Sequence, residues 1–160
     1  MSKMILTDIG ISWRVDYDEK GEACGKHVAF IANCIENVPN GKRIAGQVIM
    51  SESMFTRCVK DPDLCQKWMF AEIKHLWMGL AMKSNGLGID IDVSEVYTPM
   101  IQKFFEGFER FSQNEMPWFH VFYLVRTLKP GNKWIHEDGT TEEIKEETVV
   151  YGADLLAQEL

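Results

Sequence analysis

Aromatic and basic side chains between positions 118 and 136 form the set best suited to binding chemistry. Five residues recur at every second position, so an extended strand would place them on one face: Trp118, His120, Phe122, Leu124 and Arg126. Such a face would stack a nucleobase, and the guanidinium would bind its phosphate. We therefore expect a ligand face at His120, Arg126 and Trp134, although this alternation is more often typical of a sheet core with Arg126 at its rim.

Asp90 and Asp92 form a second candidate site. On an extended chain the two carboxylates point the same way, which is the arrangement that holds Mg²⁺ beside substrate phosphates. The glycines just before them do not form a Walker loop, because the Gly-Lys-Ser/Thr ending is missing. Acidic pairs are also common in exposed strands and loops, so a metal-dependent enzyme that uses Asp90 and Asp92 is an alternative prediction.

Two further fragments have the residue types of metal ligands. Glu72 and His75 have the Glu-x-x-His spacing of di-iron helix bundles, but the sequence has only one such motif. Cys24 and His27 lie close together, yet a zinc site needs three or four ligands, and no spacing supplies the others. There is no Gly-x-Ser-x-Gly motif. We predict no cofactor and no metal, and the balance is against an enzyme.

The N-terminal elements that would position these residues are three strands. Alternating apolar residues predict strands at Met4–Tyr17, Lys26–Ile35 and Lys42–Met50, with Gly10 as a bulge or bend. The short connections between them indicate an antiparallel meander, and Asn40-Gly41 is typical of the second turn.

The middle of the chain is predicted to be helical. Ser51 would cap a short helix, and Asp61-Pro62-Asp63 has the cap, the N1 proline and the first-turn acid that begin a helix. This long helix would end near Ser84. A third helix would begin at Thr98-Pro99, or earlier at Ser94, and end near Phe111.

The C-terminal part returns to strands. Trp118–Leu128 is predicted to be a central strand covered on both faces, Lys133–Glu137 would pair back on it, and Thr148–Tyr151 would be another strand. Residues 153–160 are predicted to form a short helix or a frayed tail. The predicted fold class is α+β, in one domain over residues 1–160. Its antiparallel sheet would consist of the N-terminal three-stranded meander plus C-terminal hairpin strands, with two or three helices packed on one face.

The long helix carries two apolar stripes. The first has the spacing of a face that packs on a sheet: Cys65, Met69, Ile73, Leu76 and Leu80. The second follows four–three steps on roughly the opposite face: Leu64, Trp68, Ala71, His75, Met78 and Met82. Because a helix with two apolar faces needs cover on both, we predict a homo-oligomer or partner seam at Trp68, His75, Met78 and Met82. Protonation of His75 would weaken that seam at mildly acidic pH.

Composition excludes several classes of function. The net charge is −7 and the basic residues are scattered, so neither nucleic acid nor an anionic membrane is a predicted partner. No segment approaches the ~18 apolar residues that span a bilayer. Four cysteines without a secretion signal predict reduced thiols in the cytoplasm.

These features lead to three functional hypotheses. The first is a non-enzymatic, oligomeric protein that binds itself and another macromolecule, for example a virus- or phage-encoded modulator or inhibitor of a host protein. The second is a protein that binds or sequesters a small ligand, such as a nucleotide, on the last hairpin. The third is the metal-dependent enzyme.

Overall fold

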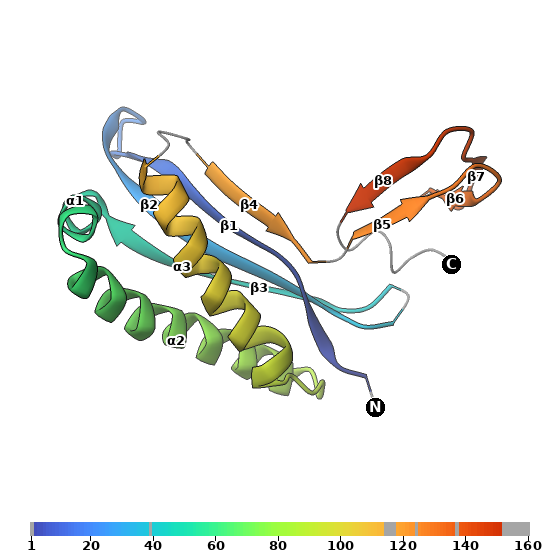
Figure 1. Cartoon of the computed structure of the whole chain (residues 1–160), viewed down its shortest axis with the longest axis horizontal. Helices are drawn as coiled ribbons and strands as arrows, with labels where there is room; N and C mark the ends of the chain where they lie inside the picture. Colours follow the sequence, from blue (N-terminus) through green and yellow to red (C-terminus); the bar gives the residue numbers. More distant parts are fainter. Residues whose placement is uncertain (1, 39, 114–117, 124, 137, 152–160) are drawn as a thin grey trace.

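The computed structural model describes residues 2–38, 40–113, 118–123, 125–136 and 138–151. Its main sheet has four antiparallel strands in the order β3-β2-β1-β4. They are β1 (Met4–Tyr17), β2 (Ala23–Glu36), β3 (Arg43–Ser51) and β4 (Trp118–Phe122). The helices lie against one face of this sheet, and the other face, the open face, carries no helix among the described residues (Figure 1). The predicted α+β class, with helices on one face of a meander sheet, is confirmed.

The meander pairs as the sequence predicts, but its irregularities are at different residues. β1 and β2 pair from Met4↔Glu36 to Tyr17↔Ala23, and the register shifts between Leu6 and Asp8 and again between Asp16 and Tyr17. The extra residue at the first shift is Thr7. Gly10 lies in regular register, opposite Ile31 on β2. The prediction of a bulge at Gly10 was wrong, because a glycine weakens a strand but does not by itself add a residue to it.

The helices begin at the predicted caps. In α1 (Glu52–Lys60) the Ser51 side chain accepts a hydrogen bond from the backbone N–H of Met54. In α2 (Pro62–Gly86) Asp61 accepts one from the N–H of Leu64. A π-helical turn, η1 (Val93–Tyr97), leads directly into α3 (Thr98–Gln113), so helical structure begins near the earlier of the two predicted starts.

The core lies between the sheet and the helices. Phe30 on β2 is fully buried and contacts the rings of Trp68, Phe104 and Phe108. Two glycines allow the layers to approach closely. A Cβ on Gly46 of β3 would lie 2.7 Å from Leu76, and one on Gly107 of α3 would lie 2.4 Å from the ring of Phe119 on β4.

The C-terminal strands differ from the prediction. β4 ends at Phe122, and within the described part of the chain it pairs with β1 alone and lies at the end of the four-stranded order, so it is not a central strand. β5 (Val125–Leu128) pairs with β8 (Thr148–Tyr151), and β6 (Lys133–Ile135) pairs with β7 (Thr141–Glu143). The predicted pairing of 133–137 with the preceding strand was therefore wrong. These two small sheets extend away from the end of β4 (Figure 1). The predicted helix or tail at 153–160 lies outside the described residues.

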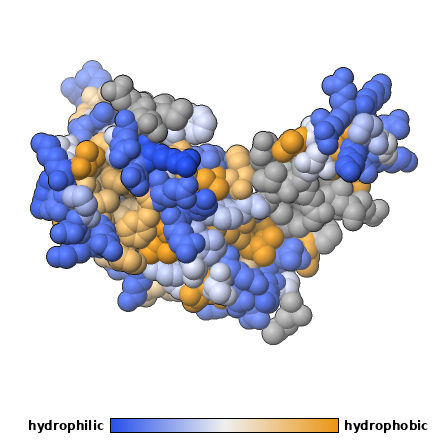
Figure 2. Space-filling model, viewed as in Figure 1, coloured by the Kyte–Doolittle hydropathy of each residue, from blue (hydrophilic) through white to orange (hydrophobic). Residues whose placement is uncertain are grey.

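The two stripes of α2 have different environments. Met69, Ile73, Leu76 and Leu80 are buried in the core as predicted. On the second stripe, Met78 is 49% exposed and Met82 is 73% exposed. Hydrophobic side chains gather on the helical face between hydrophilic borders (Figure 2). In the part of the chain that is described, no helix has the length and apolarity needed to cross a membrane.

Candidate functional site

The β1 bulge decides which polar side chains reach the open face of the sheet. Met4 and Leu6 point into the core, and after the extra residue Thr7 the core positions become Ile9 and Ile11. Side chains alternate along a strand, so this change of phase turns Asp8 to the open face. Without it, the carboxylate would be directed towards the buried helical side.

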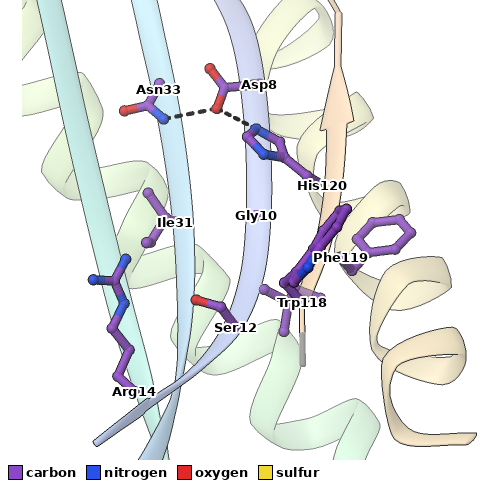
Figure 3. Close-up of a pocket in the computed structure, with 10 residues that line it drawn as sticks. Asp8, Gly10, Ser12, Arg14, Ile31, Asn33, Trp118, Phe119 and His120 are labelled. Atoms are coloured by element: carbon purple, nitrogen blue, oxygen red, sulfur yellow. Dashed lines mark hydrogen bonds and ion pairs between the residues drawn. The ribbon is translucent and has the colours of Figure 1, made fainter. Parts of the chain in front are cut away.

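Asp8 is the centre of a hydrogen-bond network across three strands (Figure 3). Its Oδ2 accepts a hydrogen bond from Asn33 Nδ2 at 3.0 Å and lies 2.8 Å from His120 Nε2. Its Oδ1 accepts one from the hydroxyl of Thr7 at 2.8 Å. The imidazole also stacks on Phe122, with 4.3 Å between ring centroids. A carboxylate with this many partners holds the imidazole and the amide in fixed orientations.

A hollow of about 220 Å³ lies beside this network. Gly10 pairs with both Ile31 and His120, so the middle of the hollow has no side chain. In Figure 3 His120 leans towards Asp8, and Trp118 lies on the other side of Gly10. Trp118 is 59% exposed, so most of its indole is open to solvent. The hollow thus has polar groups at one end and an aromatic wall at the other.

The core side of the same sheet is strongly apolar. Cys34 on β2 is only 2% exposed, and burial, with a smaller effect of the nearby Asp8 carboxylate, raises the pKa of its thiol to about 12. The network therefore lies on an apolar layer that excludes water from below. Interactions between its charged groups are screened less there than in open solvent.

The open face continues into a second polar row. Arg14 on β1 lies opposite His27 on β2, and His27 lies opposite Ser51 on β3. His27 Nδ1 is 2.6 Å from Asp16 Oδ1. Arg14 lines the hollow beside Asp8, whereas His27 and Ser51 line a wider one of about 450 Å³. The row thus has members in the lining of both hollows.

The structure separates the residues of the predicted ligand face. His120 reaches the open sheet face together with Trp118 and Phe122, which have exposed side chains. Trp134 is on β6, in the small sheet with β7. Arg126 is on β5, where it pairs with Val150, and its side chain lies outside the described set. Of the three predicted positions, His120 alone lies on the main sheet.

The predicted seam on α2 is only partly available at the surface. Trp68 is half-buried against Phe30. The His75 side chain is 66% exposed and lies 3.6 Å from Glu72 Oε2. Met78 and Met82 are exposed, so the C-terminal half of the seam is open to a partner.

The structure gives the predicted metal ligands other roles. Asp92 forms a 3.1 Å ion pair with Lys3, and the backbone carbonyl of Asp90 accepts a hydrogen bond from the N–H of Met4. Cys24 is exposed at the start of β2. Among the described residues, no three His, Cys, Asp or Glu side chains come together as metal ligands. The hypothesis of a metal-dependent enzyme thus gains no ligand set from the described residues.

Comparison with known proteins found no matching family, no similar curated protein and no similar solved structure. The site therefore has to be interpreted from its own geometry. Sequence reasoning missed Asp8, Asn33, Gly10 and Arg14. The available signal was the polar residues at positions 8, 10, 12 and 14, which alternate with Ile9 and Ile11. That pattern predicts one polar and one apolar face of a strand.

Proposed function

We propose that this chain is a non-enzymatic binding protein that holds a small planar ligand of the nucleobase class against the open face of its sheet. The observation that carries the proposal is the Asp8 carboxylate, bonded to both Asn33 and His120 beside the bare backbone of Gly10. The network presents preset polar groups, and Gly10 leaves room for a ring next to them. This develops the nucleotide-binding hypothesis from the sequence, with Asp8 and Asn33 in place of Trp134.

The hollow suits one ring system rather than a large ligand. Its volume of about 220 Å³ is below the 300–1,000 Å³ of pockets for drug-sized molecules. A ring over Gly10 would place one face on the sheet backbone and one edge near Trp118, whose indole is free to stack. The donors and acceptors of a nucleobase edge would meet His120 and Asn33.

The polar groups of the hollow are held in place before a ligand binds. Asp8 accepts a hydrogen bond from Asn33 and lies 2.8 Å from His120 Nε2. Groups fixed by mutual hydrogen bonds are preorganised for a ligand and lose little entropy when it binds.

Isothermal titration calorimetry with the common nucleosides tests this proposal. We expect Gly10→Val to abolish binding, because its side chain would fill the hollow. The Cβ itself would meet only the Phe119 carbonyl oxygen, at 3.7 Å, so the fold should persist. Gly25→Ala on the same sheet face is the control, because its Cβ would lie 3.6 Å from Asp16 and outside this hollow. If no nucleoside binds the wild type, or if Gly10→Val binds as well as the wild type, the proposal is wrong.

A second candidate function is self-association through α2, as the seam in the sequence predicts. The exposed members of the seam are Ala71, His75, Met78 and Met82, with steps of four, three and four. This spacing is the same in both directions, so an antiparallel second copy would match Ala71 with Met82 and His75 with Met78. A two-fold interface requires such self-complementarity.

Native mass by light scattering tests this second candidate. We expect a dimer for the wild type and a folded monomer for the Met78→Glu, Met82→Glu double variant. Met54→Leu, a volume-conserving change at a half-buried position away from the seam, should leave the dimer intact. A monomeric wild type at micromolar concentration would contradict self-association through α2.

A further inference from the structure

The row Arg14–His27–Ser51 continues the proposed ligand site along the open face of the sheet. Its members come from three adjacent strands and lie directly opposite one another in the register. Side chains of directly opposite residues have Cβ atoms about 4.5–5.5 Å apart. Residues that carry a guanidinium, an imidazole and a hydroxyl therefore lie in one row on this face.

The row is electrostatically suited to an anion. Arg14 is exposed, and among the described residues no carboxylate lies within ion-pair distance of its guanidinium. Asp16 Oδ1 lies 2.6 Å from Nδ1 of His27, so Nε2 is the ring nitrogen that is left for a ligand. A guanidinium beside a hydroxyl group can bind the oxygens of a phosphate.

The distance between the row and the hollow is that of a nucleotide. Arg14 is four residues from Gly10 on the same strand, which is about 13 Å along β1. An arginine side chain that lines the hollow shortens this gap. With a base over Gly10, the sugar would lie over Ser12, and a 5′-phosphate would reach the row.

We propose that Arg14, His27 and Ser51 form the phosphate subsite of the nucleobase hollow, so that the ligand is a nucleoside monophosphate. This inference rests on the proposed function of the hollow. It moves the phosphate contact from Arg126, the sequence-based choice, to a residue that lines the hollow itself.

Calorimetric titrations of AMP, GMP, CMP and UMP, each beside its nucleoside at constant ionic strength, test the subsite. We expect at least one nucleotide to bind about ten- to hundredfold more tightly than its nucleoside, which is the range of a hydrogen bond to a charged group. Arg14→Gln should reduce the ratio of nucleotide affinity to nucleoside affinity to about one. Arg57→Gln, on the exposed surface of α1, is the charge-matched control and should change neither affinity.

The outcomes separate this inference from the proposal on which it rests. Equal affinities for nucleotide and nucleoside in the wild type would overturn the phosphate subsite and leave the nucleobase hollow standing. A nucleotide preference that survives Arg14→Gln would also overturn it. Binding of neither compound would overturn both. Circular dichroism of Arg14→Gln shows whether a loss of affinity reflects lost structure.

Discussion

Gly107 on α3 lies against the ring of Phe119 on β4, and this contact gives a test of the packing that positions the site. An alanine Cβ at residue 107 would lie 2.4 Å from Cε1 and 2.5 Å from Cδ1 of that ring. Real Cβ atoms do not approach so closely, so the ring and β4 would have to move. Gly79 on α2 is the matched position, since a Cβ there would meet no atom within 4 Å.

The two substitutions should have opposite effects. Replacing glycine by alanine inside a helix stabilises by about 1 kcal/mol, and Gly79→Ala should show this gain in full. For Gly107→Ala, overpacking costs about 1–3 kcal/mol against the same gain. The two variants should therefore differ by about 1–3 kcal/mol in unfolding free energy. For a chain of this length each kcal/mol is about 2–4 °C in Tm.

Urea unfolding followed by circular dichroism measures the difference, and a Phe119→Leu background shows its cause. In that background Gly107→Ala should become stabilising, since the ring that it meets is gone; the coupling between the two positions should be about 1–3 kcal/mol. Gly107→Ala should also weaken nucleoside binding, because β4 carries Trp118 and His120. Equal stabilisation by Gly107→Ala and Gly79→Ala in the wild-type background would refute this account of the packing.

Three further predictions concern stability. The free energy of unfolding should fall as the pH rises from about 9 towards 12. In the unfolded chain the Cys34 thiol ionises near its ordinary pKa of 9.0, whereas burial raises the pKa in the folded chain to about 12. Urea titrations at several pH values should show a shallower decline for Cys34→Ala than for the wild type. Asp61→Ala removes the N-cap of α2 and should cost about 0.5–2 kcal/mol, measured as the shift of the urea midpoint. Ser84→Ala should cost about 1–3 kcal/mol, because its buried hydroxyl donates to the carbonyl of Ile89 at 2.6 Å. Ser112→Ala should be nearly neutral by calorimetry, because Ser112 is only half-buried and its hydrogen bond to the Glu109 carbonyl is exposed. Equal costs for the two serines would contradict the burial argument.

The elements that the sequence predicted correctly are those with local signals. The N-terminal meander follows from alternation and short turns, and α2 begins at Asp61 because its cap, proline and first-turn acid lie within three residues. The phase of the core stripe on α2 was also predictable, since its helical period does not depend on other elements. These features need no knowledge of what packs against them.

The C-terminal strands show where local signals end. The apolar run from Trp118 to Leu128 suggested a buried central strand, yet β4 stops at Phe122 and lies at the end of the main sheet. Both faces of an edge strand can carry large side chains when one face packs on helices and the other forms a site. Phe119 packs against α3, whereas Trp118 and His120 line the open hollow. Whether a strand is central or at the edge depends on the strands that pair with it. The partner of β4 is β1, more than one hundred residues away in the sequence.

The candidate site depends on the least predictable feature of the sheet, the extra residue Thr7 at the bulge near the start of β1. Before it, Met4 and Leu6 are core positions; after it, Ile9 and Ile11 are, so the same strand exchanges its faces between residues 6 and 9. In a regular strand Leu6 and Asp8 would lie on the same face, so either Leu6 would face solvent or Asp8 would face the core. The bulge resolves this conflict and brings the Asp8 carboxylate to within hydrogen-bond distance of His120, 112 residues further along the chain. Since a bulge disrupts a ladder at some cost, its position at the centre of the polar network supports a role for that network in binding, as well as in packing.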